Sequence, residues 1–134
     1  MTLRRKSREF ALQMLFEWDM THEKPKRVEQ LFWKSARAAD STRAFANELF
    51  EGSVTQAEST DQLIRQLSEN WRLDRLAAVD RNILRLAIFE LRSRTVPASV
   101  VIDEALELAK KFSSAEAPAF LNGILDAARK GLVG

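Results

Sequence analysis

The feature that most constrains the fold is the scarcity of chain breakers, because the 134 residues include only four glycines and three prolines. Between these breaks, apolar residues recur at spacings of three and four, the period of a helix with one buried face. No segment shows the alternation of a β-strand. The pattern predicts an all-α protein, and the length suits a single domain with its own hydrophobic core.

One segment is apolar on most of its sides. Residues 73–94 carry two apolar lines at helical spacing, and three of their five arginines, Arg81, Arg85 and Arg92, share a narrow polar strip. A helix of this kind is expected at the centre of the fold. Gly52 either ends a helix or softens it, since the periodicity resumes beyond it. Helices are predicted at residues 5–20, 26–38, 40–52, 54–67, 73–94, 100–112 and 117–130.

The small net charge of +2 is unevenly distributed. Arg4, Arg5, Lys6 and Arg8 all precede the first acidic residue, Glu9. The helix dipole already places partial positive charge at a helix start, so a cluster of cations there favours an incoming anion such as phosphate. The alternative is a basic end that only aids solubility.

The groups needed by common enzymes are absent from the sequence. There is no cysteine, the one histidine is His22, and the four glycines form no nucleotide-binding motif. We therefore expect no catalytic residue, no metal site and no cofactor. No apolar run has the length of a membrane span, and a cytoplasmic location is expected. The sequence has the character of a binding protein.

Four segments carry a family resemblance: "RRKSREFALQMLFEW", "LDRLAAVDRNILRLAIFEL", "VPASVVIDEALELAKKFS" and "FLNGILD". In order and spacing they resemble the signature segments of the NusB family of bacterial transcription antitermination factors. The similarity spans nearly the whole chain, and only residues 21–70 are poorly diagnostic. The resemblance implies one domain of six to seven helices in two packed lobes, residues 1–70 and 71–134, without enzymatic activity.

The resemblance also implies partners. NusB-like proteins bind the boxA element of nascent ribosomal leader RNA as a single strand, most tightly together with NusE, a ribosomal protein. The complex acts with other antitermination factors, and so indirectly on RNA polymerase, to carry transcription through terminators. Some relatives instead form homodimers.

Residues that match the family's motifs are expected to bind RNA. The cations would neutralise phosphates and the aromatic rings would lie beside splayed bases, the usual way in which single-stranded RNA is held. For each phenylalanine the alternative is a core residue. The predicted RNA-binding residues are Arg4, Arg5, Lys6, Arg8, Phe16 and Phe120.

Two acidic residues are expected to contact the protein partner. Asp80 matches an acidic family position that faces NusE, and Asp74 adds to it. The alternatives are that Asp74 caps its helix and that Asp80 pairs with Arg81 or another nearby arginine. Glu90, enclosed by apolar neighbours, is expected to accept hydrogen bonds from an arginine or a backbone N–H.

Two other functions compete with this one. The first is a helical protein-interaction adaptor that never touches RNA. The second is a fragment related to the RNA-binding domain of certain ribosomal RNA methyltransferases, which resembles NusB.

Overall fold

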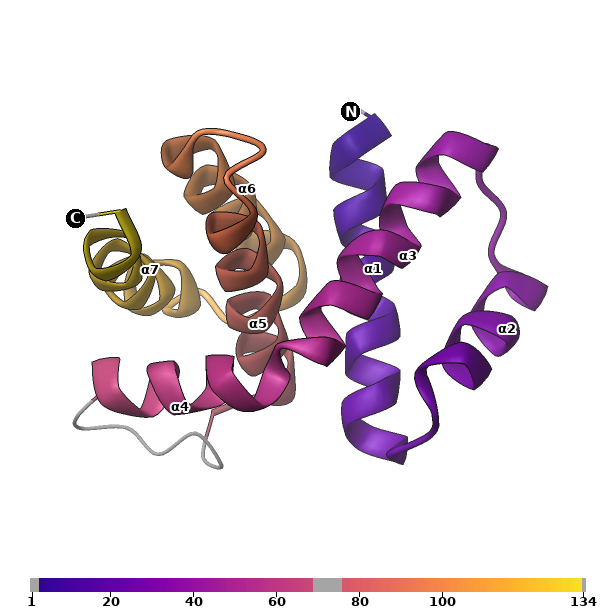
Figure 1. The fold of residues 1–134 in the computed structure, drawn as a ribbon, viewed down its shortest axis with the longest axis horizontal. Helices are drawn as coiled ribbons and strands as arrows, with labels where there is room; N and C mark the ends of the chain where they lie inside the picture. Colours follow the sequence, from indigo (N-terminus) through magenta and orange to yellow (C-terminus); the bar gives the residue numbers. More distant parts are fainter. Residues whose placement is uncertain (1–2, 69–75, 134) are drawn as a thin grey trace.

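A computed structural model gives the structure of residues 3–68 and 76–133, with the backbone alone for Leu3 and Val133 (Figure 1). The predicted Asp74 lies outside these described residues. All regular structure within them is helical, with no β-strand, so the predicted all-α class is confirmed. The helices are α1 (Leu3–Thr21), α2 (Pro25–Ser35), α3 (Asp40–Thr55), α4 (Ala57–Leu67), α5 (Ala78–Ser93), α6 (Ala98–Phe112) and α7 (Ala117–Val133).

Local chemistry sets the helix boundaries. Pro25 opens α2 because its fixed φ suits the first helical position. Before it, His22 adopts a left-handed φ of 61° and donates its N–H to the Trp18 carbonyl at 2.9 Å. Arg94 ends α5 in the same conformation, with φ of 56°. The second helix ends at residue 35, three residues before its predicted end.

Helix α5 is the centre of the core, as the pattern over 73–94 predicts. Its residues Ile83, Leu84 and Ile88 are completely buried. It packs against α1, α3, α4, α6 and α7. None of the helices in the described ranges is long and apolar enough to cross a bilayer.

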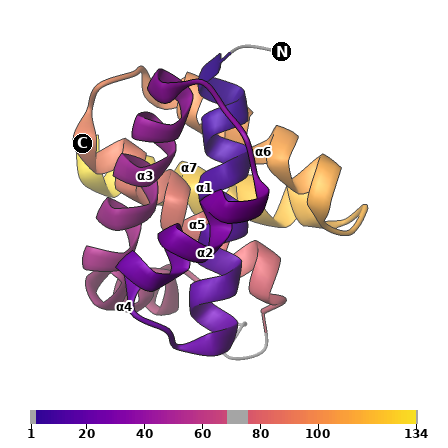
Figure 2. The same ribbon diagram turned by 90° about the vertical axis from the view of Figure 1, so that its right-hand side faces the viewer.

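The helices form two groups around α5. In Figures 1 and 2, α1 and α3 lie side by side with α2 next to them, while α6 and α7 lie at the other end of the molecule. Helix α4 packs on α5 and α7, although the expected first lobe would include it. The division of the chain into lobes at residue 70 stays a prediction.

Gly52 lies inside α3 and does not end it. The helix continues to Thr55, and a short break at Gln56 separates it from α4. A Cβ on Gly52 would lie 2.1 Å from Cζ of Phe89, so the missing side chain makes room for that ring. Glycine at this position therefore permits the close approach of α3 and α5.

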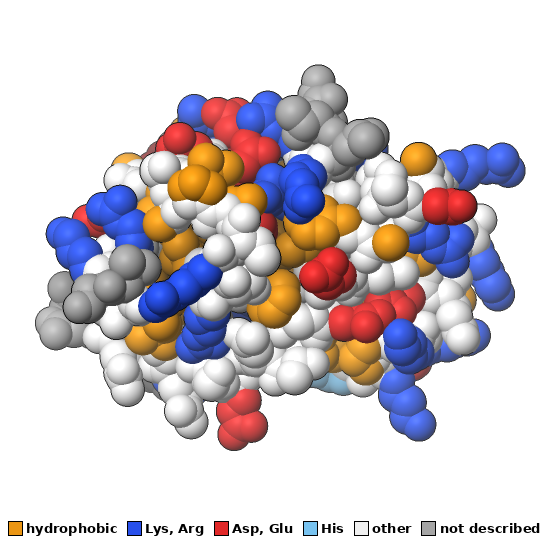
Figure 3. Space-filling view, turned by 45° about the horizontal axis from the view of Figure 1, so that its top comes forward, with side chains coloured by type: hydrophobic (Ala, Val, Ile, Leu, Met, Phe, Trp, Pro, Cys, Tyr) orange, Lys and Arg blue, Asp and Glu red, His pale blue; other side chains and the backbone are white. Residues whose placement is uncertain are grey.

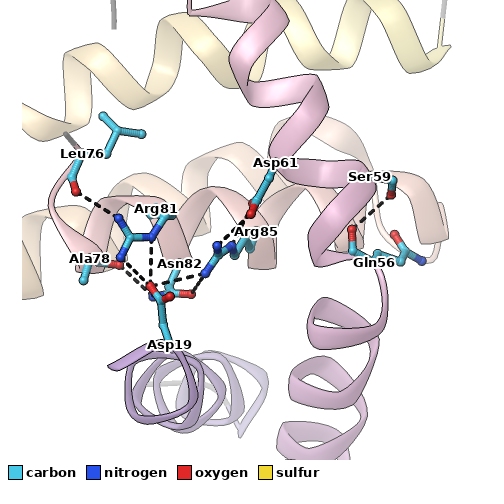
Figure 4. A network of polar contacts seen from close by, with 9 residues as sticks. All are labelled: Asp19, Gln56, Ser59, Asp61, Leu76, Ala78, Arg81, Asn82 and Arg85. Carbon is cyan, nitrogen blue, oxygen red and sulfur yellow. Dashed lines mark hydrogen bonds and ion pairs between the residues drawn. The ribbon is translucent and has the colours of Figure 1, made fainter. Parts of the chain in front are cut away.

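The polar strip of α5 ties three helices together (Figure 4). Arg81 donates to Asp19 of α1 with Nη2–Oδ2 at 2.6 Å, and Arg85 donates to Asp61 of α4 with Nη2–Oδ2 at 2.8 Å. Asn82 also donates to Asp19, at 3.0 Å. Burial works to raise the pKa of Asp19, but the hydrogen bond from Arg81 and the charge of Arg85 outweigh it and lower that pKa. These contacts hold α1 and α4 in place on α5.

Candidate nucleic-acid interface

Three of the four basic residues at the start of α1 reach the surface. Arg4 is exposed, and the side chains of Arg5 and Lys6 are 41% and 47% exposed. Figure 3 shows the face that this end of the molecule presents, where basic, acidic and hydrophobic side chains alternate. The cations therefore form a local site rather than a broad positive field.

Arg8 is placed differently from the other three. Its side chain is 5% exposed, and its Nε and Nη2 donate to the Glu90 carboxylate at 2.7 and 2.9 Å. Burial alone would lower the pKa of Arg8, but the hydrogen bonds and the charge of Glu90 raise it. The expectation that Glu90 accepts from an arginine is confirmed. We revise the role expected for Arg8, because a guanidinium held inside the protein anchors α1 instead of presenting its donors to a ligand.

Acids of α1 and α6 hold the neighbouring cations. Arg5 forms a two-pronged contact with Glu104, with Nη2–Oε2 at 2.6 Å and Nε–Oε1 at 3.2 Å. The hydrogen bond from Arg5 is the main cause that lowers the pKa of Glu104. Lys111 donates to Glu9 at 2.9 Å. These pairs fix the start of α1 against α6 while leaving part of each cation in solvent.

Arg4 has a different kind of neighbour. Its guanidinium carbon lies 4.4 Å from the centre of the Phe45 ring, a cation–π contact between α1 and α3. The Phe45 ring is half-buried. The pair borders a hollow of about 440 Å³ between the two helices.

The predicted aromatic residues lie in other surroundings. Phe16 is 37% exposed and stands twelve residues after Arg4, about 18 Å along α1 at 1.5 Å per residue. It borders an apolar hollow of about 380 Å³ together with Leu12, Val79 and Phe112. Phe120, in the first turn of α7, is half-buried and packs against the core.

The acidic residue expected at the partner surface is largely covered. Asp80 is 9% exposed and accepts a hydrogen bond from the Ser113 hydroxyl at 2.5 Å. Arg81, the alternative partner weighed for it, donates to Asp19. Asp80 nevertheless follows Val79, which borders the apolar hollow beside Phe16.

Metal chemistry finds no support in the described residues. No group of three or more histidines, cysteines and acids comes together within residues 3–68 and 76–133 to hold an ion. His22 lies alone in the turn between α1 and α2.

Comparison with known proteins places the chain in a family. The family model described as "NusB family" matches residues 5–130. The transcription antitermination protein NusB of Koribacter versatilis is 46% identical over 131 residues, which cover 96% of this chain and 90% of that protein. The chain belongs to the NusB family. The relatives that match are named as transcription antitermination proteins and not as enzymes.

Solved structures of NusB-family proteins share the fold. A structure of T. maritima NusB has a TM-score of 0.85 and 34% identity, covering 95% of this chain and 90% of that one. A structure of the antitermination factors NusB and NusE in complex with dsRNA has a TM-score of 0.85 and 29% identity, covering 96% of this chain and 97% of that one.

The sequence analysis did not identify two residues of the basic site, Glu104 and Phe45. Glu104, which holds Arg5, stands three residues after Val101 and four before Leu108, so its spacing places it at the edge of the buried face of α6. This spacing could have identified Glu104 from the sequence. Phe45 gave no such signal, because its half-burial depends on where α1 packs.

Proposed function

We propose that this NusB-family protein binds boxA-type single-stranded RNA through the start of α1 and acts in transcription antitermination with a NusE partner. The observation that carries the proposal is the cluster of partly exposed cations Arg4, Arg5 and Lys6, anchored from within by Arg8. The antitermination proteins among its relatives, and a related NusB–NusE structure that contains RNA, support this function.

The three cations suit phosphate recognition. All three lie within one turn of α1. The ion pair with Glu104 limits the conformational freedom of the Arg5 side chain before a ligand binds. A side chain that is already ordered loses less entropy on binding. Phe120 remains the proposed stacking partner for a base.

A separate surface suits the protein partner. The hollow beside Phe16 is mostly apolar, with Leu12, Val79 and Phe112 around it, and Asp80 adjoins it through Val79. Exposed aromatic rings around an apolar depression are typical of protein interfaces. We therefore assign Phe16 to NusE contact in place of the base stacking expected from the sequence.

The competing functions differ in what they require. An adaptor that does not bind RNA would leave the cations of α1 without a ligand. The methyltransferase-domain alternative has less support, because the antitermination relative is matched over 90% of its own length. In this proposal the protein acts in the cytoplasm by positioning RNA and catalyses no reaction. It acts on RNA polymerase indirectly, through other antitermination factors. A homodimer that covers the RNA surface is the alternative assembly.

The test is a titration of labelled boxA RNA at 0.15 M salt. Replacing Arg4, Arg5 and Lys6 by alanine removes about three phosphate contacts, and we expect a loss of about 50-fold in affinity. The matched control replaces three exposed cations at or within α2, Lys24, Arg27 and Lys34, and should leave affinity within about twofold. Equal losses in both variants would refute a local RNA site.

A further inference from the structure

Arg4 differs from its basic neighbours in the kind of group that its side chain contacts. Arg5 and Arg8 contact carboxylates, whereas Arg4 rests on the Phe45 ring and no ion pair joins it to an acid of the described residues. Its guanidinium carbon lies over that ring, 4.4 Å from the ring centre. A guanidinium held on an aromatic ring can offer its outer face as a platform on which a nucleobase stacks.

The hollow beside this pair has the size and chemistry of a ligand site. Its volume of about 440 Å³ falls in the range of roughly 300–1,000 Å³ that is typical of small-molecule sites. Ser7, Ser41 and Thr42 supply hydroxyl groups to its lining. Thr42 is 3% exposed, and its buried Oγ1 has no hydrogen-bond partner among the described residues.

Glu48 distinguishes a base from a phosphate. This exposed residue lines the same hollow, where its negative charge would repel a phosphate group. A carboxylate accepts hydrogen bonds from the amino and imino groups of a base edge. Guanine offers two adjacent N–H donors on one edge, whereas uracil offers one N–H between two carbonyls. The acid therefore favours guanine over uracil.

We propose that the hollow between α1 and α3 receives one unpaired base of the bound RNA, with a preference for guanine. The base stacks on the Arg4 guanidinium that Phe45 supports, and Glu48 accepts from its edge. Arg5 and Lys6 contact the flanking phosphates, and the edge N–H groups of the stacked Arg4 guanidinium donate to a third. This inference rests on the proposed RNA-binding function and adds a base-selective subsite to it.

The test compares two RNAs of twelve nucleotides, oligouridine and oligouridine with one central guanosine, by fluorescence anisotropy with the full chain. We expect the wild-type protein to bind the guanosine-containing RNA at least about fivefold more tightly, since a hydrogen bond to a charged group such as the Glu48 carboxylate is typically worth that much or more. Three variants should reduce this ratio to near one: Arg4→Lys, which keeps the charge but loses the plane, Phe45→Leu, and Glu48→Gln.

The matched control is Arg43→Lys. Like Phe45 and Glu48, Arg43 belongs to α3. Its guanidinium carbon lies 5.3 Å from the centre of the Trp33 ring, but Arg43 does not line the hollow. Its replacement should leave the ratio unchanged. Arg4→Lys and Glu48→Gln alter exposed side chains, so they keep the test valid if Phe45→Leu affects folding.

The outcomes separate the two proposals. If the wild-type protein binds boxA RNA in the titration above but neither of these oligonucleotides, the base subsite alone is refuted; if it binds none of the three RNAs, the RNA-binding function itself is refuted. Equal binding of both RNAs, or a guanosine preference that survives Glu48→Gln and Arg4→Lys, would overturn the base subsite while RNA binding stands.

Discussion

Replacing Gly52 by alanine should destabilise the protein, although alanine is the better helix former. A Cβ at this position would lie 2.1 Å from Cζ and 2.3 Å from Cε1 of Phe89. Carbon atoms in contact prefer about 3.5–4.0 Å, so the ring would have to move by more than about 1 Å. Overpacking of this kind costs about 1–3 kcal/mol, against a gain of about 1 kcal/mol in helix propensity. We expect a net loss of up to about 2 kcal/mol.

Gly123→Ala is the matched control, because Gly123 is also inside a helix and a Cβ there would meet nothing within 4 Å. This variant should gain about 1 kcal/mol in urea denaturation. In a Phe89→Ala background the ring is gone, and Gly52→Ala should then stabilise by a similar amount. If Gly52→Ala stabilises the unmodified protein as much as Gly123→Ala does, the close approach of α3 and α5 is refuted.

Two further predictions concern buried charges. Arg8→Ala leaves Glu90 buried without its guanidinium, so chemical denaturation should show a loss of about 3–5 kcal/mol; a loss below 1 kcal/mol would contradict the buried pair. Burial, a hydrogen bond shared with Glu51 and the charge of Glu51 raise the pKa of Glu29 from 4.5 to about 7, against the opposing effect of Lys26. Since the folded state then binds the proton more tightly than the unfolded chain, stability should fall as pH rises from about 4.5 through 7. Glu29→Gln should flatten this part of the stability curve, and an unchanged slope would contradict the assignment.

Sequence pattern located the helices because helical periodicity and the positions of prolines such as Pro25 are local features, but it missed some ends by several residues: the helix predicted from residue 73 begins at Ala78. It also identified the central helix, since few helices are apolar on most sides. The role of Gly52 was ambiguous from the sequence, because the ring that requires a glycine at this position belongs to Phe89, thirty-seven residues away along the chain. Pattern alone cannot show which distant side chain will pack against a glycine.

The cluster of cations at the start of α1 is visible in the sequence, but the contacts that its members make were not predictable. Arg4, Arg5 and Arg8 look equivalent in the sequence, yet they contact a ring, an acid of α6 and an acid of α5 respectively. These contacts span 41 to 99 positions in sequence and depend on how α1 packs. Glu90 was the exception, because a lone acid among apolar residues requires a buried donor wherever the chain folds.

The central claim, that exposed cations at the start of α1 hold RNA phosphates, is tested most directly by the salt dependence of RNA affinity. With about three phosphate contacts, the logarithm of affinity for single-stranded RNA should fall with the logarithm of salt concentration at a slope of about −2. The variant with alanine at Arg4, Arg5 and Lys6 should give a slope near zero. A wild-type slope near zero, or the same steep slope in that variant, would contradict the claim.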